Sequence, residues 1–127
     1  MLMSRVRSEG TAPELALRHE LSVRGARYRC HSLKLPGWPD ISNRRARVAV
    51  FVDGCFWHGC PEHFTVPKTR TEFWVEKIRR NQAKRRAVLE EYGPEWSVFE
   101  VFECELKRDS RGVAARIAPA LLRGRAP

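Results

Sequence analysis

The sequence contains no long apolar run, no internal repeat and no low-complexity tract. Its longest uninterrupted apolar segment covers residues 48–52, far short of the ~20 residues that span a bilayer. We therefore expect no membrane segment and no membrane partner. Residues 1–10 contain no apolar stretch of signal-peptide length, so we expect the chain to stay in a reducing cytoplasm.

Cysteine is also scarce, with 4 residues in 127. Disulfides are rare in a reducing compartment. Cys55 and Cys60 lie close to histidines in the sequence, which favours thiolate–metal bonding over a disulfide. Cys30 has no such neighbours, and we expect it to be a plain buried thiol.

Acidic residues are in short supply: 15 Asp and Glu stand against 24 Lys and Arg, which gives a formal net charge of +9. The basic residues concentrate in segments 44–47 and 79–86. Such an excess favours a polyanionic partner, and we expect nucleic acid. A solvated basic surface is the alternative. An anionic membrane is disfavoured because the helix predicted around 79–86 has no clean apolar face opposite its charges.

Helices and strands are predicted to alternate along one small domain, residues 1–127, which indicates the α/β class. Apolar residues fill both faces of segment 48–52, so we place this strand at the centre of the sheet. The predicted elements are a helix between Pro13 and Gly25, strands at 26–29, 40–42, 48–52 and 96–103, a helix that ends near Tyr92, and a helix at 111–122.

Turn and cap signals separate these elements. The Leu35-Pro-Gly-Trp-Pro39 segment predicts a forced turn, and 44–47 a hairpin tip. Thr69 and Glu72 have the spacing of a capping box at the start of the long helix, which Gly93-Pro94 should end. Pro119 should break or kink the last helix.

A zinc site is predicted from the spacing of soft ligands. Cys55, Cys60 and His63 lie in one loop, and Cys104 at the end of a later strand is the fourth candidate. Three Cys and one His form a closed tetrahedral set, which is typical of a structural ion. Structural zinc binds with roughly 10–16 kcal/mol, which is comparable to the stability of a small domain. The alternative is ordinary buried thiols and a surface histidine.

Acidic residues form a second candidate site. Asp40 begins one strand, Asp53 ends the next, and Glu14 lies on the first helix, so the three could bind a hard cation such as Mg²⁺. His58 could take a proton from water. This combination suits phosphodiester cleavage. Alternatively, a Pro-Asp pair is common in turns, and a lone His is often a hydrogen-bonded structural residue.

Three blocks of the sequence are distinctive: Pro39-Asp40, FVDGCFWHGCPEH at 51–63, and TEFWVEKI at 71–78 followed by Asn81. These blocks resemble the very-short-patch repair (Vsr) DNA mismatch endonucleases. The resemblance covers about residues 3–104. It implies a restriction-endonuclease-like fold, with a central mixed sheet flanked by helices and a structural zinc. The implied activity is Mg²⁺-dependent nicking of one strand beside a T:G mismatch.

The resemblance also implies the residues of the catalytic and zinc sites. Asp40 matches a metal-binding aspartate, His58 the general base, and Glu14 an acidic residue that assists from the first helix. Asp53 stands where the best-known member has histidine, and Val52 where it has threonine. A carboxylate at 53 could bind Mg²⁺ directly together with Asp40. The zinc ligands implied are Cys55, Cys60, His63 and Cys104.

DNA-binding residues are implied in the same way. Aromatic side chains match a wedge that unstacks the duplex beside the mismatch, and unstacking costs least at a mismatch. Two polar side chains match residues that face the mismatched pair, and one methionine a residue that inserts from the other groove. These residues are Phe56, Trp57 and Trp74, then Lys77 and Asn81, then Met3. Core packing is the alternative for the aromatics.

The sequence thus predicts a Mg²⁺-dependent and zinc-stabilised endonuclease that nicks double-stranded DNA in the bacterial cytoplasm, near the nucleoid. We expect a monomer, with repair proteins as possible partners. The family's N-terminal arm is expected to be nearly absent, which would relax mismatch selectivity. Two alternatives remain: a zinc-stabilised DNA-binding module without catalysis, and a less selective nuclease of the same fold.

Overall fold

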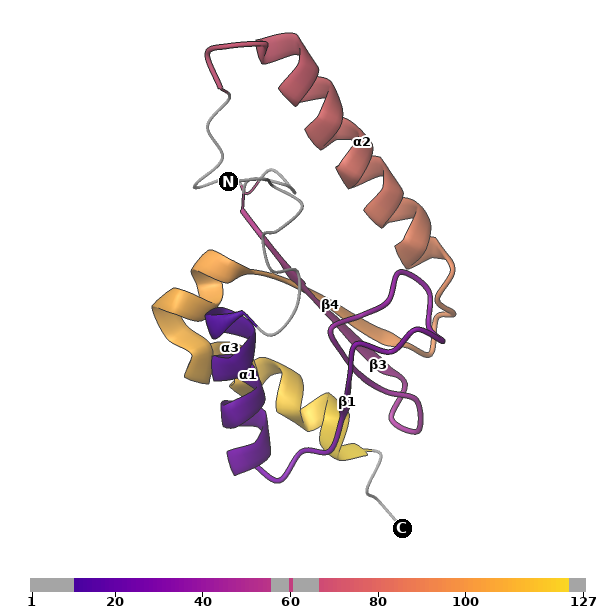
Figure 1. Ribbon diagram of the computed structural model, residues 1–127. Coiled ribbons are helices and arrows are strands. Elements are labelled where there is room, and N and C mark those ends of the chain that lie inside the picture. Colours follow the sequence, from indigo (N-terminus) through magenta and orange to yellow (C-terminus); the bar gives the residue numbers. More distant parts are fainter. Residues whose placement is uncertain (1–10, 56–59, 61–66, 124–127) are drawn as a thin grey trace.

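The computed structural model describes residues 11–55, 60 and 67–123. Helices α1 and α3 lie side by side against the sheet, whereas α2 projects away from this pair (Figure 1). The α/β prediction is confirmed. The elements, in chain order, are α1 Ala12–Val23, β1 Arg29–Cys30, β2 Ile41–Asn43, β3 Val48–Asp53, α2 Thr71–Glu90, β4 Ser97–Phe102 and α3 Glu103–Leu122.

The four strands form one mixed sheet in the order β1-β2-β3-β4. The pairs β1/β2 and β2/β3 are antiparallel, and β3/β4 is parallel. Val50 of β3 lies between Ile41 of β2 and Phe99 of β4. The central position predicted for segment 48–52 is therefore confirmed.

The two faces of β3 pack against different parts of the protein. Val48 and Val50 join the core formed with α1 and α3. The side chain of Phe51 points to the other face of the sheet, toward the C-terminal end of α2 and the loop after it. There its ring packs edge to face on the Tyr92 ring, with 6.4 Å between the ring centroids. The α1/α3 core is made of Leu17, Leu21, Ala26, Ile41, Ala46, Val48, Val50, Val101, Leu106, Val113, Ala114, Ile117, Ala118 and Leu121.

Helix α1 follows its sequence signals. The Thr11 side chain accepts a hydrogen bond from the Glu14 backbone N–H, and Pro13 occupies the first turn. Leu17 and Leu21 are spaced four residues apart and are fully buried. Gly25 follows the helix with φ of 80°, a conformation that glycine adopts at low cost. The first turn of α1 is thereby fixed, and Glu14 with it.

The predicted capping box at the start of α2 is wrong. The N-cap is Arg70 in a left-handed conformation (φ 56°), with no side-chain cap bond. The Thr71 hydroxyl instead donates to the carbonyls of Pro67 and Lys68 at 2.8 and 3.1 Å, so a turn before the helix replaces the box. The helix ends at Glu90, slightly before the predicted Tyr92.

Helix α3 begins at Glu103, directly after β4, and not at 111. Its kink lies at Asp109 (φ −159°, ψ 74°), whose carboxylate accepts the Gly112 N–H at 2.9 Å and so caps the second segment. The helix continues through Pro119, against our expectation. Pro119 lies on the exposed side, while Ile117 and the residues of its face are held in the core.

The edge strand β1 is shorter than predicted and lies later in the chain, at Arg29–Cys30 and not at 26–29, whereas β2 has its predicted length. A long loop joins β1 to β2. Gly37 and Trp38 both have positive φ values, 72° and 52°. A Cβ on Gly37 would lie 2.4 Å from a Val88 methyl, so only glycine fits there without displacement. The predicted turn at 35–39 is confirmed, as is the tip at 44–47. Among helices of the described ranges, none is long and apolar enough to cross a bilayer.

Candidate active site

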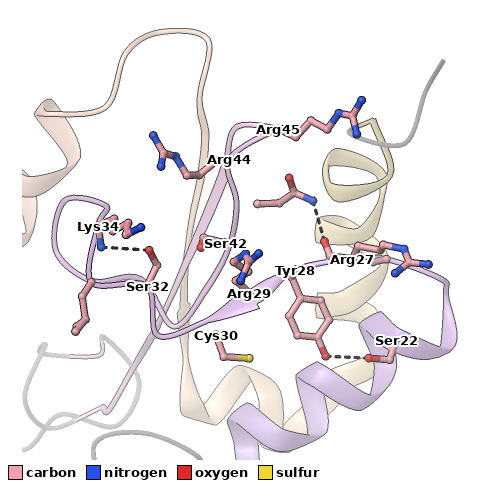
Figure 2. A pocket seen from close by; sticks show the side chains of 13 residues that line it. Ser22, Arg27, Tyr28, Arg29, Cys30, Ser32, Lys34, Ser42, Arg44 and Arg45 are labelled. Carbon is pink, nitrogen blue, oxygen red and sulfur yellow. Dashed lines mark hydrogen bonds between the residues drawn. The ribbon is translucent and has the colours of Figure 1, made fainter.

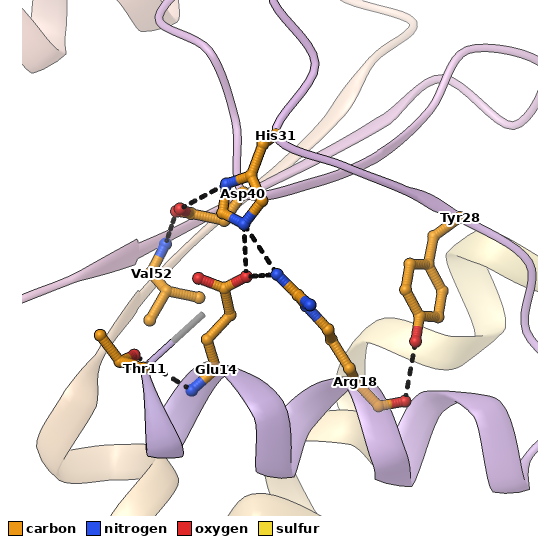
Figure 3. Close-up of polar contacts among 7 residues, drawn as sticks. All are labelled: Thr11, Glu14, Arg18, Tyr28, His31, Asp40 and Val52. Carbon is orange, nitrogen blue, oxygen red and sulfur yellow. Dashed lines mark hydrogen bonds and ion pairs between the residues drawn. The ribbon is translucent and has the colours of Figure 1, made fainter. Parts of the chain in front are cut away.

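Glu14, His31 and Asp40 meet at one end of the sheet edge. They offer ligand atoms that all lie within 4.8 Å of one another. His31 stands between the two carboxylates, with Nε2 2.9 Å from Glu14 Oε2 and Nδ1 3.8 Å from Asp40 Oδ1 (Figure 3). We call these three residues the acidic cluster.

Asp40 is fixed by the pairing of β2 with β3. Its backbone N–H donates to the Val50 carbonyl at 2.9 Å, and its Oδ2 accepts the Val52 N–H at 2.7 Å. Burial raises the pKa of the Asp40 carboxyl to about 6, with a further rise from Glu14 and a partly opposing effect of the Val52 hydrogen bond. The carboxyl therefore loses its proton at a higher pH than an exposed aspartate, and a bound cation would favour its ionised form.

Glu14 supplies the second carboxylate of the cluster, and it is more deeply buried than Asp40. It lies in the first turn of α1, where the helix dipole favours negative charge, and its residue is 1% exposed. One oxygen contacts both His31 and Arg18, the latter one turn along the helix. Arg18 thus compensates a charge that would be costly if it were buried alone.

Sequence reasoning missed His31. Cys30 of β1 pairs with Ile41 of β2, and the two strands are antiparallel. The residue after Cys30, which is His31, therefore lies opposite the residue before Ile41, which is Asp40. The His31 N–H accordingly donates to the Asp40 carbonyl at 3.0 Å. The antiparallel pairing of β1 with β2 is the signal that places the imidazole beside Asp40.

Asp53 lies at the end of β3 but is not part of the acidic cluster. Its two oxygens accept hydrogen bonds from Arg85 at 2.5 and 2.8 Å, and its side chain is 5% exposed. It is close enough to contribute to the raised pKa of Asp40. A magnesium-binding role for Asp53 stays a prediction. The predicted base His58 lies outside the described residues.

Three of the four predicted zinc ligands come together. The sulfurs of Cys55, Cys60 and Cys104 lie within 4.8 Å of one another, and Cys60 Sγ to Cys104 Sγ measures 3.6 Å. Zn–S bonds of about 2.3 Å in a tetrahedron place sulfurs about 3.8 Å apart. Cys104 reaches the site from the first turn of α3, and not from a strand end as predicted. His63 lies outside the described residues.

The electrostatics of this thiol cluster also suit a cation. Burial, followed by the thiols of Cys60 and Cys55, raises the pKa of Cys104 to about 12. Three thiolates can therefore coexist here only around a positive ion. Cys30 is separate from the cluster and exposed, which corrects the prediction that it is buried.

Trp74, Lys77 and Asn81, which are predicted to contact DNA, all lie on α2. Trp74 is half-buried and its ring packs edge to face on Phe73 at 5.0 Å. Lys77 and Asn81 follow at helical spacing on the same side. Their roles toward DNA stay predictions, and Met3, Phe56 and Trp57 lie outside the described residues.

The arrangement can support hydrolysis of a charged ester. One buried and one partly buried carboxylate, with an imidazole between them, are suited to hold a hard divalent cation. A cation in such a site neutralises charge on a phosphodiester as it is attacked. The cysteine cluster, built only from thiols among its described members, suits a structural ion instead.

Comparison with known proteins agrees with this chemistry. The sequence profile of the family described as DNA mismatch endonuclease Vsr matches residues 1–63. The type II nicking enzyme V.XorIIP of Xanthomonas oryzae pv. oryzae is 42% identical over 120 residues, which cover 91% of this chain and 86% of that protein. V.NmeAIP of Neisseria meningitidis, also a type II nicking enzyme, is 39% identical over 111 residues, or 84% and 77% of the two chains.

A third relative carries the family's own name. The DNA mismatch endonuclease Vsr of Escherichia coli K12 is 40% identical over 109 residues, which cover 83% of this chain and 69% of that enzyme. This identity extends over most of both chains. The acidic cluster and the thiol cluster are both arranged as metal-binding sites could be. The chain therefore belongs to the Vsr family of DNA mismatch endonucleases and is a DNA endonuclease.

Proposed function

We propose that this endonuclease has the restriction-endonuclease-like fold, depends on Mg²⁺, and nicks one strand of duplex DNA beside a T:G mismatch. The observation that carries the metal dependence is the acidic cluster, in which Glu14 and Asp40 lie on either side of His31. Mg²⁺ prefers one or two carboxylates together with substrate phosphate oxygens. The donor set fits that preference.

Each residue has a distinct role in this proposal. Asp40 and Glu14 would hold Mg²⁺, which when bound supplies positive charge to the phosphodiester under attack. His31 would orient Glu14 through Nε2, 2.9 Å from Oε2, and its Nδ1 lies 3.8 Å from Asp40 Oδ1. His58 would accept a proton from the attacking water. Asp53, fixed by Arg85, would take part as a further carboxylate.

The structural ion and the DNA contacts complete the proposal. Zn²⁺ would be bound by Cys55, Cys60 and Cys104 with His63 as the fourth ligand. The mismatch would be recognised by insertion of aromatic side chains, because unstacking costs less at a mismatched step. The DNA-contacting residues proposed are Met3, Phe56, Trp57, Trp74, Lys77 and Asn81. The enzyme would act as a monomer in the bacterial cytoplasm, at the nucleoid.

The decisive experiment is an end-labelled nicking assay on T:G and T:A duplexes at one fixed salt concentration, with Mg²⁺ or with a chelator. We expect one nick, only with Mg²⁺ and only in the T:G duplex. Equal nicking rates on both duplexes would contradict mismatch specificity and support a less selective nuclease. No nicking by wild type, with binding retained, would leave a DNA-binding module.

Two variants test the acidic cluster directly. Asp40→Ala should abolish nicking and leave DNA binding largely intact. Glu14→Gln should reduce nicking strongly, and Glu20→Gln on the same helix is its matched control. Glu20 also pairs with an arginine four residues later, Arg24, at 2.9 Å, but lies outside the cluster. Equal effects of the two glutamine variants would contradict a catalytic role for Glu14.

A further inference from the structure

A basic groove runs along the sheet edge next to the acidic cluster. It has a volume of about 1290 Å³ and lies between the end of α1 and the hairpin made by β1 and β2. Figure 2 shows Arg44 and Arg45 at one end and Cys30 at the other. The groove plays no part in the function argued so far.

The lining of this groove is strongly positive. Its charged residues are all basic, and all are exposed: Arg27, Arg29, Lys34, Arg44 and Arg45. Within the described ranges, no ion pair joins any of the five to a carboxylate. Arg18, Arg24 and Arg85, in contrast, each pair with an acid. Clustered charges that are not compensated focus a positive field along the groove.

Residues next to the acidic cluster in the chain line this groove. Cys30 and Ser32 line it and are the chain neighbours of His31. At the partner strand, Ser42 lines the groove two residues after Asp40. Asp40 and Arg44 flank β2, and extended chain between them spans at most about 13 Å, at roughly 3.3 Å per residue. That length corresponds to about four nucleotides of a duplex, at 3.4 Å of rise per nucleotide.

We propose that this groove binds the sugar–phosphate backbone of the DNA strand that flanks the nick. The proposal rests on the nuclease function proposed above. Guanidinium groups bind phosphate oxygens in two-pronged geometry, and the groove offers four of them with one lysine. Contacts to phosphate carry no sequence information. The groove therefore supplies affinity and alignment of the strand, and the choice of mismatch depends on other residues.

The salt dependence of DNA binding tests this role. Each phosphate contact contributes about 0.9 to the slope of log K against log salt. We test two double variants, Arg27→Gln/Arg29→Gln and Arg44→Gln/Arg45→Gln. Each double variant should reduce the magnitude of that slope by about 2. Affinity should fall by the same factor for T:G and T:A duplexes. Binding is measured with a chelator present, over about 50 to 200 mM salt, so that cleavage does not interfere.

The matched control removes the same charge elsewhere. Arg116→Gln/Arg123→Gln, both on the α3 side and outside the groove, should leave the slope at the wild-type value. Wild-type slopes in the groove variants, or an equal reduction in the control, would overturn the proposal. Far-UV circular dichroism confirms that each variant is folded. Nicking by the wild-type protein with Mg²⁺ is measured separately. Failure of the nuclease proposal is therefore distinguishable from failure of the groove proposal.

Discussion

Arg85 holds both carboxylate oxygens of Asp53, at 2.5 and 2.8 Å, and so joins α2 to the end of the central strand. The guanidinium also lies over the Phe51 ring, 4.3 Å from its centroid, and 3.4 Å from Glu100. Planar two-pronged pairing of this kind fixes orientation as well as charge. The helix proposed to contact the mismatch is thereby tied to the strand end beside Asp40.

Loss of this pair should destabilise the protein strongly. Arg85→Met leaves the Asp53 carboxylate buried without its main partner, and we expect the free energy of unfolding to fall by about 3–5 kcal/mol. Arg86→Met, at an exposed neighbouring position, should change it by less than about 0.5 kcal/mol. Urea denaturation measures both values. Asp53→Leu in the Arg85→Met background should recover most of the loss, and failure to do so would show that the buried charge is not the cause.

The sequence predicted those parts of the fold that local signals determine. Pro13 and Gly25 mark the two ends of α1, and apolar residues on both faces of segment 48–52 place β3 at the centre of the sheet. The start of α3 was missed because Val113 and Ile117 carry a clear helical pattern, whereas the turn before the Asp109 kink buries only Leu106. Helical periodicity is weak in a segment with one buried residue.

The candidate site was predicted where it follows from residue type. An acid at a strand start, an acid on the first helix and clustered cysteines indicated Asp40, Glu14 and the thiols as candidates, and the structure brings Glu14 to Asp40 and the three thiols together. The pair of Asp53 with Arg85 joins residues 32 positions apart, and no local pattern reports such a contact. His31 was missed because two-residue strands such as β1 give almost no periodic signal, although pairing determines its place.

Gly37 should be essential for the loop that leads into Asp40. Its φ of 72° costs an L-residue about 1–2 kcal/mol, and an added Cβ would meet a Val88 methyl at 2.4 Å and the Phe51 ring at 3.1 Å. With overpacking, Gly37→Ala should lose about 2–4 kcal/mol of unfolding free energy. In a Val88→Ala background the same change should cost only about 1–2 kcal/mol. Equal costs in the two backgrounds would contradict the predicted clash.

The thiol cluster should bind one zinc ion per chain. Cys104→Ser removes a ligand whose sulfur lies 3.6 Å from that of Cys60, so zinc content by mass spectrometry should drop and the melting temperature should fall. Cys30→Ser, an exposed thiol outside the cluster, is the control and should retain the metal. Full zinc content in Cys104→Ser would exclude this residue as a ligand.

Asp40 should make the stability of the metal-free protein depend on pH in an uncommon direction. Burial raises its pKa from 3.8 to about 6, so the folded state binds a proton that the unfolded state has already released. The contribution is fully present below about pH 4 and is lost as the pH rises through about 6. Its size is up to about 3 kcal/mol, at 1.36 kcal/mol per pKa unit.

The measurement is urea denaturation from pH 3.5 to 7.5 in a chelating buffer, with wild type compared with Asp40→Asn. The difference in unfolding free energy should shift in favour of Asp40→Asn as the pH rises from 4 to 7. The exposed Asp109→Asn variant, in which the new amide can still cap Gly112, should follow the wild-type curve. Mg²⁺ prefers the ionised carboxylate, so adding it at pH 7 should stabilise wild type and leave Asp40→Asn nearly unchanged. Parallel curves for wild type and Asp40→Asn would show that the pKa of Asp40 is not raised in the folded state.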